Sequence, residues 1–129
     1  MKKFITKGAG LPEWSAPISH AVVVGNTCYL SGQLSLDADG RYLPGTASEE
    51  AQRAFRNLGN ALHAAGFTFE DMVFVDIAFI DLDDLPEVNT VFAKVFSAGS
   101  PPARTIYQAA GLPYGARIKI TGVAAREQA

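Results

Sequence analysis

The stretch Ser100-Pro101-Pro102-Ala103-Arg104-Thr105-Ile106-Tyr107-Gln108 places a proline pair at the start of a β-rich run that carries one arginine. Proline fixes φ and donates no backbone hydrogen bond, so the pair predicts an extended entry into a strand. Strand alternation puts Arg104 and Ile106 on one face. The planar guanidinium fits a carboxylate with two parallel hydrogen bonds. Arg104 is therefore either an anchor for a small carboxylic acid or a surface arginine at the end of a strand.

The composition is that of one ordinary globular domain over residues 1–129, with 48% hydrophobic and 19% charged residues. A net charge of −2 provides no basic surface for nucleic acid. Cys28 is the only cysteine, which excludes an internal disulfide framework. Because the sequence shows no secretion signal and no apolar run of bilayer length, it predicts a cytoplasmic protein without a membrane partner.

A hairpin is predicted upstream of the arginine stretch. Residues 21–24 are β-branched, residues 27–31 return with a strand-like composition, and Gly25-Asn26 between them suits a tight turn. Gly32 then interrupts the second strand. A glycine inside a strand indicates a bulge or a close approach of the backbone to another group, such as a ligand.

Two helices are predicted among the remaining strands. Residues 47–65 carry apolar side chains at three- and four-residue steps and end at Gly66. A long apolar run at 72–80 indicates a central strand, Pro86 suits the start of a second helix, and residues 116–124 alternate as a last strand. With two helices and about six strands, the helices should cover one face of a sheet, which is an α+β arrangement.

Five landmarks occur in the order and at the spacing of a known family. They are Ala16-Pro17-Ile18-Ser19-His20-Ala21, Tyr29-Leu30-Ser31-Gly32-Gln33, Asn57-Leu58 with Ala64-Ala65-Gly66, Val88-Asn89-x-Val91-Phe92, and Pro102-Ala103-Arg104 followed by Leu112-Pro113-x-Gly115. Together they resemble the Rid family, also called YjgF or endoribonuclease L-PSP, along nearly the whole chain. The resemblance implies a chorismate-mutase-like α+β fold, with a mixed sheet of about six strands and two helices, and a homotrimer.

The resemblance also implies a function. Members of the family hydrolyse enamines and imines derived from amino acids and release ammonia, in clefts between neighbouring subunits, with no metal and no organic cofactor. A 2-iminobutanoate/2-iminopropanoate deaminase-like hydrolase is therefore expected. The arginine of P-A-R binds the substrate carboxylate in the family, and Arg104 occupies its place. The cleft positions that the resemblance implies are Arg104 and Lys119 as catalytic residues, with Ser31, Gly32, Ile18, Ile106, Phe92 and Tyr114 as further substrate-binding residues.

Three of these positions depart from the family pattern. Ile18 replaces a tyrosine, and Ile106 replaces a small residue. Lys119 stands where the family's last strand, approximately I-E-I-E-A, has a glutamate thought to position the hydrolytic water. An ammonium group cannot accept a proton from water. Beside Arg104, Lys119 adds a second positive charge, which favours an anionic ligand and even one with two acidic groups, unless Lys119 points into solvent.

Three functions stay open at this point. An imine deaminase needs a held carboxylate and a positioned water, and His20, Tyr114 or a backbone group can position the water. For His20, a structural hydrogen-bonding role is the alternative. A non-catalytic trimer that senses a 2-oxo or dicarboxylic acid fits the missing glutamate. A ribonuclease fits poorly, because the chain is acidic and shows neither paired histidines nor a basic stripe with aromatic residues.

Overall fold

The structure is a computed structural model and describes residues 1–127. Six strands form one mixed sheet in the order β1-β2-β3-β6-β4-β5. The strands are β1 (Lys2–Ile5), β2 (Ala21–Val24), β3 (Thr27–Gln33), β4 (Met72–Phe79), β5 (Ala103–Gln108) and β6 (Ile118–Ala125). Strands β4 and β5 are parallel, and the other neighbours are antiparallel.

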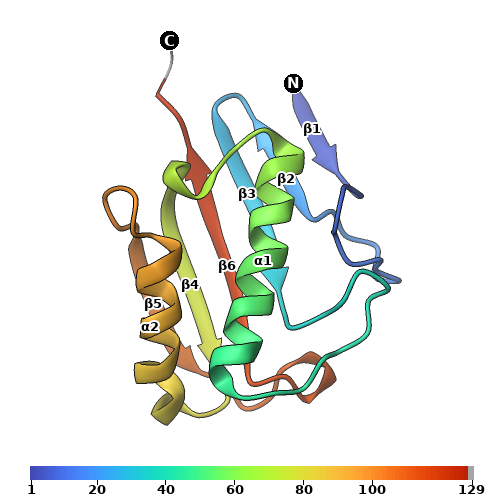
Figure 1. Ribbon diagram of the computed structural model, residues 1–129. Coiled ribbons are helices and arrows are strands. Elements are labelled where there is room, and N and C mark those ends of the chain that lie inside the picture. Colours follow the sequence, from blue (N-terminus) through green and yellow to red (C-terminus); the bar gives the residue numbers. More distant parts are fainter. Residues whose placement is uncertain (128–129) are drawn as a thin grey trace.

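Both helices lie on the same face of the sheet, as Figure 1 shows. They are α1 (Ala47–Ala65) and α2 (Leu85–Val95). The predicted α+β arrangement, with two helices covering one face of a six-stranded mixed sheet, is confirmed. Within residues 1–127 no α-helix covers the opposite face of the sheet, and we call it the helix-free face.

Helix α1 begins and ends where local chemistry dictates. The Thr46 hydroxyl accepts a hydrogen bond from the Glu49 backbone N–H at 3.1 Å, and the Glu49 carboxylate accepts one from the Thr46 N–H at 2.9 Å. This capping box satisfies two backbone donors at the start of the helix. Gly66 ends it in the left-handed conformation, with φ of 85°.

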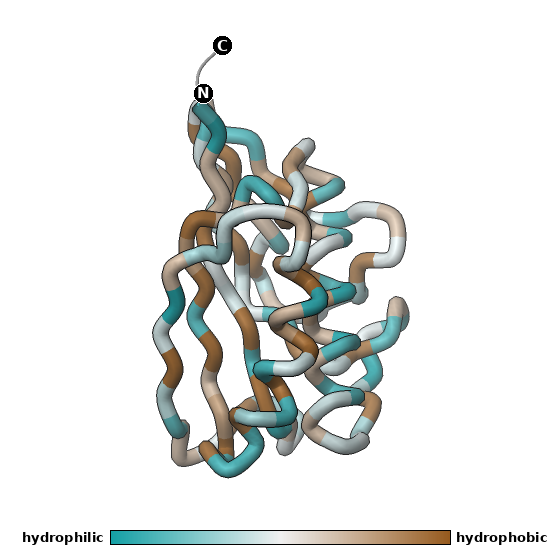
Figure 2. Tube along the Cα trace, turned by 60° about the vertical axis from the view of Figure 1, so that its left-hand side comes forward, coloured by the Kyte–Doolittle hydropathy of each residue, from teal (hydrophilic) through white to brown (hydrophobic). Residues whose placement is uncertain are grey.

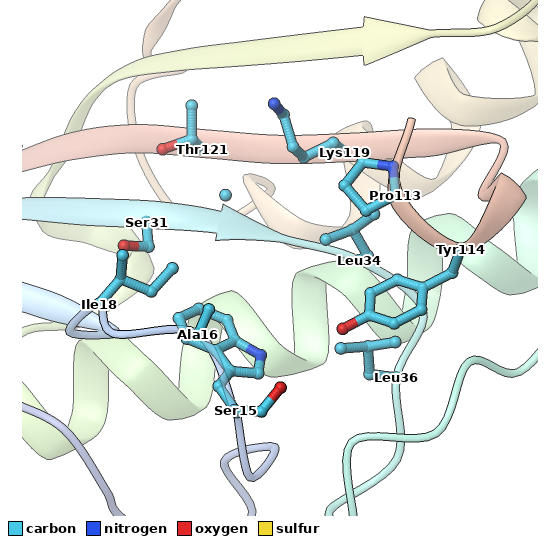
Figure 3. Close-up of a pocket in the computed structure, with 12 residues that line it drawn as sticks. Ser15, Ala16, Ile18, Ser31, Leu34, Leu36, Pro113, Tyr114, Lys119 and Thr121 are labelled. Atoms are coloured by element: carbon cyan, nitrogen blue, oxygen red, sulfur yellow. The ribbon is translucent and has the colours of Figure 1, made fainter. Parts of the chain in front are cut away.

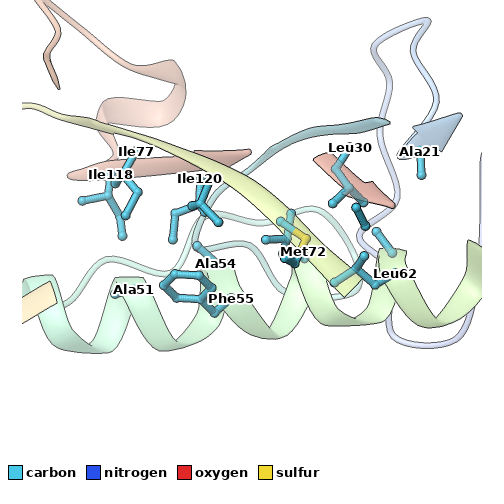
Figure 4. Packing of buried hydrophobic residues seen from close by; sticks show 14 of the residues in the cluster. Ala21, Leu30, Ala51, Ala54, Phe55, Leu62, Met72, Ile77, Ile118 and Ile120 are labelled. Carbon is cyan, nitrogen blue, oxygen red and sulfur yellow. The ribbon is translucent and has the colours of Figure 1, made fainter. Parts of the chain in front are cut away.

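The core lies between α1 and the sheet, as Figure 4 shows. Phe55 and Leu62 of α1 belong to one buried cluster with Ile77, Ile118 and Ile120 of β4 and β6, and all five side chains are almost completely buried. Burying each contributes roughly 1.5–3 kcal/mol to stability. Figure 2 shows the matching pattern along the strands, where hydrophobic and hydrophilic residues alternate.

Strand register decides which side chains face the helices. Arg104 pairs with Val75, which is fully buried under the helices. Lys119 pairs with Ala78, whose neighbours Ile77 and Phe79 point into the core. Because side chains alternate along a strand, Arg104 projects on the helix side and Lys119 on the helix-free face. The predicted bulge at Gly32 is confirmed by a shift in the β3–β6 register between Leu30 and Gln33.

No helix within residues 1–127 is long and apolar enough to cross a membrane.

Candidate functional site

A cavity of about 380 Å³ lies on the helix-free face, above β3 and β6 (Figure 3). Its walls come from four parts of the chain: the loop before β2, strand β3 with the residues after it, the turn before β6, and β6 itself. The residues that line it are Trp14, Ser15, Ala16, Ile18, Ser31, Gly32, Leu34, Leu36, Pro113, Tyr114, Lys119 and Thr121. The volume falls within the range of about 300–1,000 Å³ that ligand pockets occupy.

Lys119 and Gly32 together form the part of the cavity over the sheet. A Cβ atom added to Gly32 would stand 2.8 Å from Lys119 Cδ, so the lysine stem lies directly against the glycine backbone. The expected close approach at Gly32 is therefore made by the lysine of the neighbouring strand. None of the described residues forms a salt bridge with Lys119. Its ammonium group is thus available to an anionic ligand.

Two hydroxyl groups on the strands face the same cavity. The Ser31 hydroxyl donates to the Ser19 carbonyl at 2.6 Å, and the Thr121 hydroxyl donates to the Leu30 carbonyl. Each donor is therefore used inside the protein, while the oxygen lone pairs stay free to accept a hydrogen bond from a water or a ligand. Ile18 lies beside Ser31 in Figure 3 and is 54% exposed.

Tyr114 reaches the cavity from the turn that precedes β6. Its φ of 64° lies in the left-handed region, which non-glycine residues seldom adopt. In Figure 3 its hydroxyl points into the cavity, toward Leu36. The ring also lies near Tyr42, at 6.5 Å between centroids, and the Tyr42 hydroxyl donates to the buried Glu50 carboxylate at 2.6 Å. Burial and the nearby Glu50 carboxylate raise the pKa of Tyr42 to about 12.

His20 has a structural role, which was one of the two interpretations of the sequence. It is 1% exposed, and both ring nitrogens have partners: Nε2 lies 2.9 Å from the Pro12 carbonyl, and Nδ1 lies 3.0 Å from Gln33 Nε2. A neutral ring that donates from Nε2 and accepts at Nδ1 satisfies both contacts. Burial lowers the pKa of His20, although the hydrogen bond to Pro12 opposes the shift. His20 therefore cannot orient water in the cavity.

Arg104 lies outside the cavity of its own chain. Its Nη1 donates to Asn89 Oδ1 at 2.7 Å, and its guanidinium stands 4.8 Å from the centre of the Phe92 ring. Ile106, two residues along β5, packs at the edge of the core. These contacts fix the guanidinium at the exposed edge of the sheet beside α2. The amide oxygen and the ring hold Arg104 without neutralising its charge.

The predicted site residues thus fall into two groups. Ile18, Ser31, Gly32, Tyr114 and Lys119 meet in the cavity on the helix-free face. Arg104, Phe92 and Ile106 gather on the helix side, near the opposite edge of the sheet. Sequence reasoning missed the apolar lining from Leu34 and Leu36. The alternation of Leu34 and Leu36 on the same side as Gly32 was the available signal.

Comparison with known proteins identifies relatives along almost the whole chain. Residues 10–126 match the model of the family described as endoribonuclease L-PSP. The chain belongs to this family. It is 41% identical over 121 residues to a Bos taurus protein named 2-iminobutanoate/2-iminopropanoate deaminase, a match that covers 93% of this chain and 88% of the relative. The Homo sapiens protein of the same name is 39% identical over 117 residues, covering 90% and 85%.

Two solved structures of other proteins have the same fold. RidA from a Psychrobacter species superimposes with a TM-score of 0.89 at 31% identity, covering 96% of this chain and 100% of the other. Escherichia coli TdcF with bound serine superimposes with a TM-score of 0.90 at 25% identity, covering 97% and 100%. In this chain, no carboxylate from residues 1–127 lines the cavity.

Proposed function

We propose that this protein is a hydrolase that releases ammonia from 2-imino acids. The names of its relatives support the reaction, and the serine bound to TdcF supports a small amino-acid-like ligand. The observation that carries the proposal is the cavity over Gly32 and Lys119, which offers a cation, free hydroxyl lone pairs and no competing carboxylate. Such a site suits an anionic substrate whose C=N carbon must be reached by water.

The cavity and Arg104 meet only if two copies of the chain come together. Within one chain the sheet separates them, because Arg104 projects on the helix side and Lys119 on the helix-free face. The helix-free face also exposes large side chains, among them Tyr29 at 54% and Tyr107 at 45%. Exposed apolar surface of this kind marks interaction sites. We therefore propose a homotrimer in which Arg104 of one copy faces the cavity of its neighbour, in a ring of head-to-tail contacts.

The reaction needs few groups. Water adds to the C2 atom of the imine, the nitrogen takes up a proton, and the resulting carbinolamine expels ammonia to leave a 2-oxo acid. Arg104 binds the substrate carboxylate through its planar fork. Fixing the carboxylate places C2 in the cavity, where positioning alone accelerates addition of water. With His20 buried, the Tyr114 hydroxyl and the Ser31 and Thr121 oxygens are the side-chain groups that can orient the water.

Ammonia release tests this function directly. The parent protein should accelerate hydrolysis of freshly generated 2-iminopropanoate and 2-iminobutanoate over the buffer reaction, and Arg104→Ala should lose most of the acceleration. Arg126→Ala provides the matched control, because Arg126 also stacks on a phenylalanine ring but on Phe67, away from the cavity. Hydrolysis at the buffer rate with the parent protein would contradict the function.

One observation favours a second function, a non-catalytic trimer that binds a 2-oxo or dicarboxylic acid. Lys119 occupies the cavity, and no carboxylate lines it to accept a proton from water. Binding of pyruvate by the parent protein without any release of ammonia from imines would support this alternative. A ribonuclease has no comparable support, since the net charge is −2 and Lys119 is the one cation among the described residues that line the cavity. The cytoplasmic location stays a prediction.

A further inference from the structure

One half of the cavity is apolar and has aromatic side chains. Leu34 and Leu36 form its floor, and Trp14 and Tyr114 line its walls. Figure 3 shows Tyr114 on one side and Ser15 and Ala16, the two residues that follow Trp14 in the sequence, on the other. The two leucines are already buried, at 6% and 0% exposure, whereas Trp14 is half-buried and Tyr114 is 57% exposed. A side chain of one or two carbons would leave most of this exposed aromatic surface in water. The apolar half of the cavity therefore suits a ligand with a larger apolar side chain.

Trp14 is held in place by contacts that do not involve a ligand. Its ring stacks on the buried His20 ring at 3.7 Å between centroids. The loop around it is fixed by the Pro12 carbonyl, which contacts His20, and by the Glu13 N–H, which donates to the Ala38 carbonyl at 3.0 Å. A ring that is already ordered loses little conformational freedom when a ligand packs against it. Trp14 is thus a preorganised wall of the cavity.

Tyr114 has a backbone conformation that is energetically unfavourable for a tyrosine. Its φ is 64°, and the side chain is exposed at the mouth of the cavity, with the residue as a whole 57% exposed. Glycine or asparagine would adopt this conformation more easily. Non-glycine residues in sparsely populated conformations cluster at ligand sites, where the side chain has a use. A strained, exposed tyrosine that points into a cavity indicates contact with a ligand.

We propose that this cavity selects 2-imino acids with an aromatic or large aliphatic side chain. The side chain packs between Trp14 and Tyr114 over the two leucines, while the carboxylate faces Lys119 and the neighbour's arginine. This inference rests on the proposed function, because it names the substrate class of the same site. Stacking and edge contacts between aromatic rings supply the selectivity.

The test compares imines made in situ from D-alanine and D-phenylalanine by a D-amino acid oxidase. The imine is planar at C2, so the configuration of the amino acid does not matter. Semicarbazide traps the free imine, and the fall in semicarbazone measures hydrolysis. We expect kcat/KM for the phenylalanine-derived imine to exceed that for the alanine-derived imine by about tenfold or more. A ratio of one or below would overturn the inference.

Two variants locate the selectivity. Tyr114→Gly removes the ring and suits the positive φ, so its fold is retained; Trp14→Ala removes the other wall. Each should lower the ratio of the two kcat/KM values by about tenfold. Phe4→Ala is the matched control, because Phe4 is an exposed aromatic residue on β1, outside the cavity. A ratio that is the same in both cavity variants and in the parent would overturn the inference.

Calorimetry separates this inference from the proposed function. Phenylpyruvate should bind the parent protein more tightly than pyruvate or 2-oxoglutarate, and Tyr114→Gly should weaken phenylpyruvate most. If phenylpyruvate binds most tightly but no imine is hydrolysed, the selectivity for aromatic side chains is supported and the hydrolase function is contradicted. Tightest binding of 2-oxoglutarate would overturn the inference and place a second carboxylate at Lys119.

Discussion

The stem of Lys119 lies against the backbone of Gly32, so closely that a Cβ atom on the glycine would stand 2.8 Å from Lys119 Cδ and 3.0 Å from Cγ. The two residues come from adjacent strands, β6 and β3, and both line the cavity on the helix-free face. The absence of a side chain at position 32 therefore decides where the lysine ammonium can stand. The position of this charge is coupled to the glycine.

Gly32→Ala should displace the Lys119 side chain and weaken binding of 2-oxo acids. The displaced atoms belong to a flexible side chain, so the free energy of unfolding should fall by no more than about 1 kcal/mol. In the background of Lys119→Ala, Gly32→Ala should lower the free energy of unfolding and the affinity for pyruvate by less, because the clash with the lysine stem is gone. A double-mutant cycle on urea unfolding and on the Kd for pyruvate measures this coupling. Strictly additive effects of the two substitutions would show that position 32 does not constrain the Lys119 side chain.

Lys119→Glu should increase the hydrolysis of alanine- and serine-derived imines. A glutamate at this position can accept a proton from the attacking water, which an ammonium cannot do, and general base catalysis contributes about 10²–10⁴-fold. The measurement is the initial rate of ammonia release beside the parent protein, with Lys119→Gln as the control for loss of charge alone. If the parent is already as fast as Lys119→Glu, position 119 does not control the chemistry.

Arg104→Lys should lose carboxylate affinity although the positive charge is kept. A point ammonium cannot reproduce the planar fork that Asn89 and Phe92 hold in place. Losing one charge-assisted hydrogen bond costs roughly 1.5–3 kcal/mol, or about 10- to 100-fold in the Kd for pyruvate or 2-oxobutyrate by calorimetry. Arg126→Lys is the matched control. Unchanged affinity in Arg104→Lys would remove the arginine from its anchoring role.

The protein should lose stability as the pH falls below about 6.5. Burial lowers the pKa of His20 in the folded protein, so between the lowered pKa and about 6.5 the unfolded chain binds more protons than the folded one. This contribution is fully present above pH 6.5 and is lost as the pH falls through the folded pKa. Urea unfolding between pH 7.5 and 5.5 measures it.

His63→Gln, a substitution on the exposed side of α1, should leave this dependence on pH in place. Stability that stays flat in the parent over the same pH range would mean that His20 accepts a proton in the folded state without cost.

Local sequence signals predicted most of the fold because they act over a few residues. The Thr46 cap and Gly66 define α1, and Gly25-Asn26 closes the hairpin of β2 and β3, without help from distant parts of the chain. Alternation also placed Ile118 and Ile120 in the core and Lys119 away from it. The family resemblance added the order of the elements.

The site could be predicted only in part, because its geometry depends on contacts between distant segments. Arg104 and Lys119 project from opposite faces of the sheet because β4 pairs with both β5 and β6. No local sequence pattern reveals this pairing. Trp14 reaches the cavity because His20 and Gln33, thirteen residues apart, fix its loop. The strained turn at Tyr114 was visible only as a proline and a glycine around an aromatic residue.

In the proposed homotrimer, each active cleft combines the cavity of one copy with Arg104 of its neighbour. Arg104→Ala disables one side of the cleft, and Gly32→Phe fills the other side over the stem of Lys119. Each variant alone should form trimers by light scattering and release little ammonia. When equal amounts are unfolded and refolded together, random assembly makes about a quarter of the clefts intact, since each side is unaltered with a probability of one half. We therefore predict that the mixture recovers about a quarter of the parent's rate of ammonia release, whereas a mixture no more active than either variant alone would contradict the shared cleft.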